Sequence, residues 1–227
     1  MFQNREEAGR QLAARLAQYR DDAAAMILAL PRGGVAVAYS MSLELRLPLD
    51  VFITRKLGAP ENPEFAIGAV SESGMVYVNH NSAELCGVSQ ADLAQLVREQ
   101  RQEISRRQVL YREGRSLPSL CDRTVLLVDD GIATGATFFA SVHGIRDLKP
   151  HRLVAAIPVG PRETLHEVRR LVDDLVVLEI PDPFFAVGNH YVNFAQVQDK
   201  DVIRYLDLAK KALYGDSKCT SEPLSLQ

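Results

Sequence analysis

The stretch VLLVDDGIATGATFF at residues 125–139 decides the fold class of this chain. Its four leading apolar residues predict a buried strand of a parallel sheet, and its two glycines allow a tight loop before a helix begins. At such a junction the backbone N–H groups, the positive end of the helix dipole and the hydroxyls of Thr134 and Thr137 would converge on a phosphate group. Asp129 and Asp130 would repel that phosphate, so they are better suited to accept hydrogen bonds from ribose hydroxyls or to lie beside a divalent cation. The segment therefore predicts a sugar-phosphate site.

Two other interpretations account for an apolar strand that ends in acidic residues. One is a Walker B strand, but the chain contains no G-x-x-x-x-G-K-[ST] sequence, so a nucleoside triphosphatase is poorly supported. The other is a buried acidic pair in an ordinary doubly wound domain. A structural turn has no need for both the acidic pair and the Thr-Gly-Ala-Thr loop, so the sugar-phosphate interpretation is favoured.

The same segment resembles the 5-phosphoribosyl-1-pyrophosphate (PRPP) motif of the type I phosphoribosyltransferases, in which four apolar residues and an acidic pair precede a short loop ending in Thr-Gly-x-Thr. The resemblance implies an enzyme that uses PRPP together with Mg2+. It also implies that Asp129 and Asp130 are the catalytic pair, which holds the ribose hydroxyls and, indirectly, the metal ion. The residues that it assigns to the 5′-phosphate are Ala133, Thr134, Gly135, Ala136 and Thr137.

The composition is compatible with this interpretation and disfavours several others. A length of 227 residues with 47% hydrophobic content is enough to bury the core of one main domain. The net charge of −3 provides no basic face that would predict nucleic-acid binding. Cys86, Cys121 and Cys219 are odd in number and lack C-x-x-C spacing, which favours reduced thiols in a cytoplasm over disulfides or a zinc site. No signal-like segment or membrane-spanning apolar run is evident, so we expect a cytoplasmic protein without a membrane partner.

Strand-like and helix-like segments alternate along the chain, which predicts an α/β fold with a doubly wound, mostly parallel sheet. The expected strands are residues 26–30, 49–54, 125–128, 153–158 and 175–180. The expected helices are residues 4–19, 35–45, 90–113, 162–171 and 201–213, with a further helix after the PRPP-like loop. Residues 65–79 hold two short strand-like runs joined by a turn at Ser73 and Gly74, which predicts an edge hairpin.

We expect residues 1–213 to form a single domain with a helical insertion at 80–118 and a small hood at 181–195, followed by a disordered polar tail at 214–227. The long polar helix of the insertion carries apolar residues at helical spacing. It would form either a homodimer interface or a wall of the acceptor pocket, and an exposed polar helix fits its composition equally well.

The loops after the strands are expected to form one site, because ligands of open parallel sheets bind at the carboxyl ends of the strands. Arg32, Gly33 and Gly34 follow the first strand, where backbone amides and a guanidinium group suit pyrophosphate, although a simple glycine turn is the alternative. Preceding the PRPP-like motif as it does, this loop resembles the pyrophosphate loop of the type I family. Arg55 and Lys56 end the second strand, either as a solvated strand end or as polyphosphate ligands.

Residues 55–65 also resemble a known segment. The pair Arg55 and Lys56 is similar to the Arg-Lys pair that follows the equivalent strand in orotate phosphoribosyltransferases. The Gly-, Pro- and Asn-rich continuation looks like the mobile loop that closes over PRPP in that family. Such a loop would keep water away from an oxocarbenium-like centre.

Four aromatic residues gather after the last expected strand: Phe184, Phe185, Tyr191 and Phe194. Each alone fits the core of a small lid, whereas together they would form a hood for a planar base. Residues 179–188 resemble the segment E-I-P-D-x-F-x-x-G of hypoxanthine-guanine phosphoribosyltransferases. This resemblance implies that Phe184 stacks on a base and that Phe185 lies in the same binding segment.

Two departures from that family leave the acceptor undefined. Where the hypoxanthine-guanine enzymes have an acidic residue shortly after this segment, the chain has Asn189, His190 and Asn193. Where they have an aspartate near the base, it has Ala133, as adenine-type enzymes do, and alanine cannot transfer a proton. His190 is a candidate for that role by side-chain type, but a lone loop histidine is more often structural.

Residues 26–194 are most similar to a large group of predicted bacterial phosphoribosyltransferases with the signatures L-P-R-G-G and V-D-D-G-x-A-T-G, whose acceptor is unassigned. The resemblance implies transfer of ribose 5-phosphate from PRPP to a small-molecule nitrogenous acceptor, a nucleobase-like heterocycle, with release of pyrophosphate. The alternative is a non-catalytic protein that senses PRPP or a nucleotide, since some relatives regulate transcription with this cradle. No basic or helix-turn-helix-like segment supports that alternative.

Overall fold

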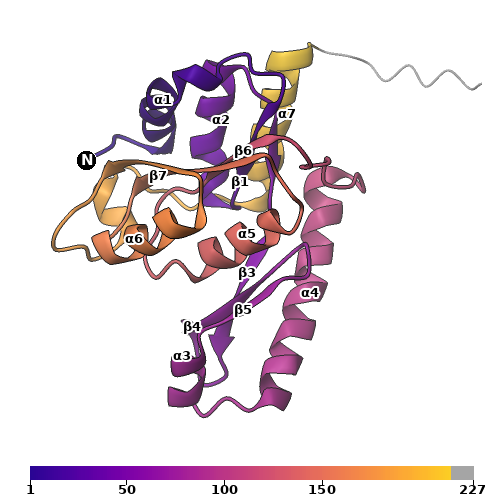
Figure 1. Cartoon of the computed structure of the whole chain (residues 1–227), viewed down its shortest axis with the longest axis vertical. Helices are drawn as coiled ribbons and strands as arrows, with labels where there is room; N and C mark the ends of the chain where they lie inside the picture. The colour runs from indigo at the N-terminus through magenta and orange to yellow at the C-terminus, as the bar shows by residue number, and fades with distance from the viewer. Residues whose placement is uncertain (216–227) are drawn as a thin grey trace, which may run out of the picture.

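A parallel sheet forms the centre of the protein (Figure 1). The computed structural model describes residues 1–215, and its main sheet has five strands in the order β2-β1-β6-β7-β8. These strands are β1 (Ala25–Ala29), β2 (Leu49–Val51), β6 (Thr124–Val128), β7 (Arg152–Val159) and β8 (Asp174–Glu179). Every neighbouring pair is parallel. Since β1 and β6 are adjacent, the loops that follow them meet at one edge of the sheet.

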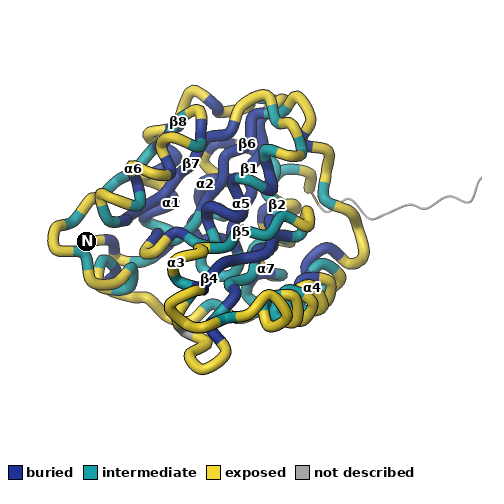
Figure 2. Tube along the Cα trace, turned by 60° about the horizontal axis from the view of Figure 1, so that its bottom comes forward, coloured by how far each residue is buried: buried dark blue, intermediate teal, exposed yellow. Residues whose placement is uncertain are grey.

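Helices cover both faces of this sheet, because successive residues of each buried strand point to opposite sides. Ile27 and Leu126 belong to the core under one helical layer, whereas Leu28 and Leu127 belong to the core under the other. The first layer consists of α1 (Arg5–Arg15), α2 (Gly33–Leu45) and α7 (Asp199–Tyr214), and the second of α5 (Ala136–Arg146) and α6 (Arg162–Leu171). In Figure 2 the central strands are buried between these layers. The doubly wound α/β fold expected from the sequence is confirmed.

A second, antiparallel sheet projects from the first with the order β3-β4-β5. Its strands are β3 (Thr54–Ala59), β4 (Asn62–Ser71) and β5 (Val76–Val78), and the helices that follow them are α3 (His80–Leu85) and α4 (Gln90–Arg112). Together these elements form an arm below the main sheet in Figure 1. The hairpin expected within residues 65–79 is present as β4 and β5, but it pairs with β3 and not with the edge of the main sheet.

The expectation of a loop at residues 57–65 is wrong, because most of this segment is paired in β3 and β4. Leu57 and Ala59 are buried, which stabilises the strand conformation. Gly58 allows the two strands to approach closely, since a Cβ atom there would lie 2.3 Å from the carbonyl oxygen of Pro63. Gly58 and the neighbouring prolines are therefore part of a tight, bulged hairpin and not of a loop.

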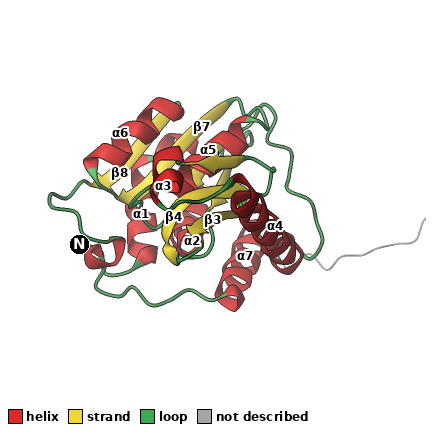
Figure 3. Ribbon diagram, turned by 90° about the horizontal axis from the view of Figure 1, so that it is seen from below, coloured by secondary structure: helices red, strands yellow, loops and turns green. Residues whose placement is uncertain are grey.

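The long helix expected at residues 90–113 is α4, and a buried ion-pair network holds its carboxyl end. Arg112 is 2% exposed. Its guanidinium donates to Oδ1 of Asp50 (3.0 Å), to Oε1 of Glu72 (2.9 Å) and to the carbonyl oxygen of Val51. The network ties the arm to the main sheet, so that α4 runs beside α7 when the molecule is viewed from below (Figure 3).

Several helix ends differ from the expected ones. Helix α1 ends at Arg15, and residues 17–19 form a short 3-10 helix, η1 (Ala17–Tyr19). Helix α2 begins at Gly33, two residues before the expected start, and α7 includes Tyr214, the first residue of the expected tail. Gly215 follows the end of α7, and the rest of the expected tail, residues 216–227, lies outside the described residues.

Candidate functional site

The loops after β1 and β6 lie against each other at the carboxyl edge of the main sheet. Ala29 pairs with Val128, and the next residue, Leu30, donates its N–H to the Val128 carbonyl (2.8 Å). Gly33 lies so close to the acidic pair that a Cβ atom on it would be 1.9 Å from Oδ2 of Asp130. Any larger residue would have to displace the carboxylate, so the glycine is a steric requirement of this edge.

Gly34 makes a similar approach to the neighbouring backbone. A Cβ atom there would lie 2.8 Å from the carbonyl oxygen of Val128 and 2.9 Å from Cα of Asp129. The structure therefore brings together the two motifs that the sequence analysis connected, and it places the first turn of α2 directly beside the acidic pair.

The acidic pair consists of two largely buried carboxyl groups, and Arg5 is a close cationic partner of Asp130. Burial, together with the charge of Asp130, holds the pKa of Asp129 well above its ordinary value. Burial also raises the pKa of Asp130, and the guanidinium of Arg5 opposes that increase. Arg5 Nε lies 2.7 Å from Oδ2 of Asp130, and their side chains are 10% and 15% exposed. The two carboxylates thus repel each other when both are ionised, and the positive charge of Arg5 reduces the cost of this repulsion.

Sequence reasoning missed Arg5, although a signal for it existed. Arg5 shares the buried face of α1 with Ala8 and Leu12, three and seven residues further on. An arginine on the apolar face of an amphipathic helix needs an anionic partner, because a buried cation without one is costly. The hydrophobic periodicity of α1 could therefore have predicted a partner for Arg5 but not which residue it is.

Two of the four expected hood aromatics support the acidic pair from behind. The hydroxyl of Tyr191, which is 5% exposed, donates to the carbonyl oxygen of Asp130 (2.6 Å). The ring of Phe194 stacks on Tyr191 with centroids 5.1 Å apart, and the guanidinium of Arg5 lies 3.8 Å from the Phe194 centroid. The expectation that all four aromatics form one hood is thus wrong, because Tyr191 and Phe194 pack under Asp130 and Arg5.

Phe184 and Phe185 occupy the remaining part of the segment after β8. Phe184 stacks on His190 with ring centroids 5.8 Å apart and an interplanar angle of 7°. Nδ1 of His190 lies 3.4 Å from Oε2 of Glu179 at the end of β8, and the short helix η2 (Val187–His190) carries the histidine. Phe185 is 77% exposed. Phe184 therefore has a fixed position beside the sheet edge, whereas Phe185 points to solvent.

The loop after the acidic pair lines a cleft of about 130 Å³. Residues 131–138 form most of it, together with Lys56 and Asp129. Gly135 has a φ angle of +77° and precedes α5, whose first turn has no side-chain cap. The backbone N–H groups of Ala136 and Thr137, at the positive end of the helix dipole, are consequently available for an anionic ligand.

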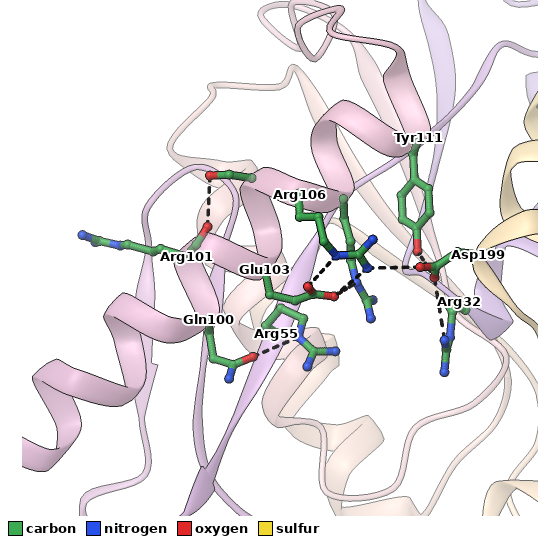
Figure 4. Close-up of polar contacts among 10 residues, drawn as sticks. Arg32, Arg55, Gln100, Arg101, Glu103, Arg106, Tyr111 and Asp199 are labelled. Atoms are coloured by element: carbon green, nitrogen blue, oxygen red, sulfur yellow. Dashed lines mark hydrogen bonds and ion pairs between the residues drawn. The ribbon is translucent and has the colours of Figure 1, made fainter.

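The two cations expected at a strand end lie inside β3 instead, since pairing with β4 extends the strand to Ala59. Neighbouring strand residues face opposite sides. Lys56 lines the cleft of the 131–138 loop, whereas Nε of Arg55 donates to Oε1 of Gln100 on α4 (3.0 Å). Arg32 lies 3.7 Å from Oδ1 of Asp199 at the start of α7. Figure 4 shows Arg32 and Arg55 beside the polar side chains of α4.

Two further observations bear on possible ligands and surroundings. Within residues 1–215, no group of three or more histidine, cysteine, aspartate or glutamate side chains is placed to hold a metal ion. None of the helices in this range combines the length and the apolar character needed to cross a bilayer.

At this edge of the doubly wound sheet, the loops after β1 and β6 bring glycines, an acidic pair and an uncapped helix start together. This arrangement is typical of α/β proteins that bind anionic ligands. The phosphoribosyl transferase domain family matches residues 2–192. The chain therefore belongs to the phosphoribosyltransferase family.

Individual relatives agree with this membership. The chain is 41% identical over 211 residues to a Mycobacterium tuberculosis protein (strain H37Rv) named "Putative phosphoribosyl transferase Rv0571c". That alignment covers 93% of this chain and 47% of the relative, so the chain spans about half the length of the curated relatives it matches. The crystal structure of TT1426 from Thermus thermophilus is similar with a TM-score of 0.75 and 38% identity, over 91% of this chain and 97% of that one.

Proposed function

We propose that the protein is a Mg2+-dependent phosphoribosyltransferase that transfers ribose 5-phosphate from PRPP to a nitrogenous acceptor, a nucleobase-like heterocycle, and releases pyrophosphate. The observation that carries the proposal is the contact of Gly33 and Gly34 with the Asp129–Asp130 pair. This contact puts two helix starts, α2 and α5, around two carboxylates at one sheet edge. Phosphates would be bound by the helix starts, and sugar hydroxyls by the carboxylates.

Each loop has a distinct role in the proposed complex. Ala133, Thr134, Gly135, Ala136 and Thr137 would bind the 5′-phosphate at the start of α5, where backbone N–H groups are uncapped. Arg32, Gly33, Gly34, Arg55 and Lys56 would bind the pyrophosphate. Asp129 and Asp130 would accept hydrogen bonds from the ribose hydroxyls.

The acidic pair also fits Mg2+ in a limited way. Mg2+ commonly uses one or two carboxylates, substrate phosphates and several water molecules, and it does not require a cluster of three protein ligands. Oδ2 of Asp130 is engaged by Arg5, and Oδ1 of Asp129 accepts a hydrogen bond from the Asp130 N–H (2.8 Å). The pair would therefore hold the ion through water, and the ion would neutralise charge on the pyrophosphate.

The chemistry follows from this placement. The acceptor nitrogen forms a bond to C1 of the ribose, the bond from C1 to pyrophosphate breaks, and pyrophosphate leaves with the bonding electrons while the nitrogen releases its proton. The residues assigned above hold both ends of PRPP, which orients C1 toward the acceptor. We place the acceptor against Phe184, whose ring is fixed by stacking on His190 at the end of the sheet.

The test mixes protein, PRPP and Mg2+ with a panel of nucleobases and amines, and follows pyrophosphate release and the mass of any nucleotide product. We expect one acceptor to give stoichiometric pyrophosphate and a 5′-monophosphate. Phe184→Ala should raise the KM for that acceptor about fivefold, because an aromatic stack contributes on the order of 1 kcal/mol beyond burial. Val192→Ala is the control, because Val192 is 63% exposed in the same segment, and it should change this KM little. Tight PRPP binding without product from any acceptor would favour a sensor over an enzyme.

We also propose a cytoplasmic location. Cys86 and Cys121 are exposed and form no disulfide in the described part of the chain, as expected for thiols in a reducing compartment. Fractionation of cells that express the protein with a terminal tag would test this.

A further inference from the structure

Helix α4 contributes a group of arginines to the end of the site assigned above to pyrophosphate. Arg106 and Arg107 lie near the carboxyl end of α4, and α4 packs against β3 and α7. Asp199, the first residue of α7, accepts hydrogen bonds from Tyr111 (2.7 Å) and Arg106 (3.1 Å) on α4, and it also faces Arg32 (3.7 Å). Figure 4 shows this convergence, with Arg55 entering from β3.

Cations outnumber anions in this group. Its guanidinium groups belong to Arg32, Arg55, Arg106 and Arg107, and its carboxylates belong to Glu103 and Asp199. Burial is the main reason that the pKa of Arg55 is lowered, and the charge of Arg107 is the next. Arg55 lies against the same face of α4, because Gln100, which accepts its hydrogen bond (3.0 Å), is seven residues before Arg107 on this helix. Such an excess of positive charge, with Arg107 as its buried member, favours an anionic ligand at this position.

The two arginines of α4 differ in what holds them. The side chain of Arg106 is 53% exposed, and it donates to both oxygens of Glu103 and to Asp199. The side chain of Arg107 is 9% exposed, and its Nε lies 2.7 Å from Oε1 of Glu103. Glu103 would thus keep Arg106 as a partner if Arg107 exchanged it for another anion.

We propose that Arg107 is a pyrophosphate-binding residue of PRPP, and that Glu103 holds its guanidinium in place until the ligand binds. This inference rests on the proposed function and adds α4 to the walls of the same site. Arg107 lies on the side of the sheet that carries Arg32 and Arg55, away from the segment of Phe184 after β8. It therefore acts on the leaving group and not on the acceptor. A planar guanidinium group can donate to two phosphate oxygens at once. A diphosphate would therefore fit between Arg107 of α4 and the pair Arg32 and Arg55.

Isothermal titration calorimetry in Mg2+ with three ligands tests the proposal: PRPP, inorganic pyrophosphate and ribose 5-phosphate. Arg107→Gln should weaken PRPP and pyrophosphate about 10- to 100-fold, the usual effect of losing a charge-assisted hydrogen bond, and leave ribose 5-phosphate unchanged. Arg107→Lys should recover part of the loss. A merely structural arginine would change all three ligands or none.

Two further variants make the test sharper. Glu103→Gln removes the competing carboxylate and should tighten pyrophosphate binding several-fold, whereas loss of a structural ion pair would not. Arg98→Gln is the matched control, because Arg98 lies on the same helix and donates to the nearby Gln95 (2.6 Å); it should leave all three affinities unchanged. If Arg107→Gln fails to fold, Glu103→Gln and Arg107→Lys still decide the matter.

The outcomes separate this inference from the proposed function. Wild-type affinity for pyrophosphate in folded Arg107→Gln, or no tightening in Glu103→Gln, would overturn the role of Arg107 and leave PRPP binding standing. A wild-type protein that binds neither PRPP nor pyrophosphate would overturn both.

Discussion

Replacement of Arg5 by glutamine should destabilise the protein in a pH-dependent way. Arg5 donates a hydrogen bond to Asp130, and both side chains are largely buried. Removing one partner of a buried ion pair costs about 3–5 kcal/mol, because the other charge is left uncompensated. Glutamine and arginine have similar helix propensities, so α1 itself should be little affected. We expect a loss of about 3 kcal/mol in the free energy of unfolding at pH 8.

The sign of the pH dependence follows from the acidic pair. Burial raises the pKa of Asp129 and of Asp130 in the folded protein. At a pH between the unfolded-state and the folded-state pKa of these groups, the folded protein binds more protons than the unfolded chain. Its stability therefore falls as the pH rises through that range. Without Arg5 the pKa of Asp130 should rise further. One additional bound proton is worth about 1.4 kcal/mol per pH unit, so the penalty should become smaller as the pH falls.

Urea unfolding followed by circular dichroism at pH 5, 6, 7 and 8 measures this effect. At pH 8 the thermal midpoint should also decrease, by about 6–12 °C for a domain of this size. Arg10→Gln is the matched control, because Arg10 is exposed on the same helix, and it should change stability by less than about 0.5 kcal/mol. The same small loss in both variants, or a loss for Arg5→Gln that does not vary with pH, would show that Arg5 does not neutralise the acidic pair.

Three further predictions follow from the same geometry. Gly33→Ala should reduce PRPP affinity at least tenfold in calorimetry, because its Cβ atom would lie 1.9 Å from Oδ2 of Asp130 and must displace the carboxylate. Arg112→Met should lower the free energy of unfolding in urea by about 3–5 kcal/mol, because it leaves the carboxylate of Glu72, 3% exposed, without its guanidinium partner. PRPP should raise the thermal midpoint in Mg2+ but not in EDTA, and equal stabilisation in both would remove the metal ion from the proposed complex.

The main sheet could be predicted because its signals are local. Each central strand is a short apolar run, and each run is followed within a few residues by a glycine-containing loop and a helix. The contact of Gly33 with Asp130 also follows from such signals, since parallel strands bring their carboxyl ends to one edge. The burial of these strands on both faces follows from the alternation of strands and helices, whereas their order in the sheet, β2-β1-β6-β7-β8, is known only from the structure.

The arm could not be predicted in the same way, because the same residue types occur both in flexible loops and in closely packed strands. Glycine, proline and asparagine are common in flexible loops, and they also occur where two strands approach too closely for a side chain. Gly58 belongs to the second case, with Pro63 as the close neighbour. Only the pairing of Leu57 with Gly68 across the sheet, which is a tertiary contact, decides between them.

The candidate site shows the same limit for charged and aromatic residues. Asp130 is separated from Arg5 by 125 residues, and Asp199 from Arg106 by 93. No periodicity connects partners that are so distant in sequence. Sequence motifs therefore identify the loops that surround a ligand, but they do not identify the arginines that pair with the acidic residues of these loops. The aromatic hood failed as a set for this reason, since Tyr191 contacts Asp130 behind the pair.

The position of α4 follows from these long-range contacts and has a functional consequence. Helix α4 buries Ile104 and Tyr111 in the core, and a buried ion pair adds a directional contact to the domain. The buried Arg112–Glu72 pair fixes the carboxyl end of α4, and the hydrogen bonds to Asp199 fix the turn that carries Arg106 and Tyr111. A helix held only by hydrophobic contacts could slide or rotate, whereas these directional contacts determine which face meets the loop after β1. The polar character that made this helix resemble a solvated insertion therefore includes contacts to the main domain, such as the hydrogen bond from Arg55 to Gln100.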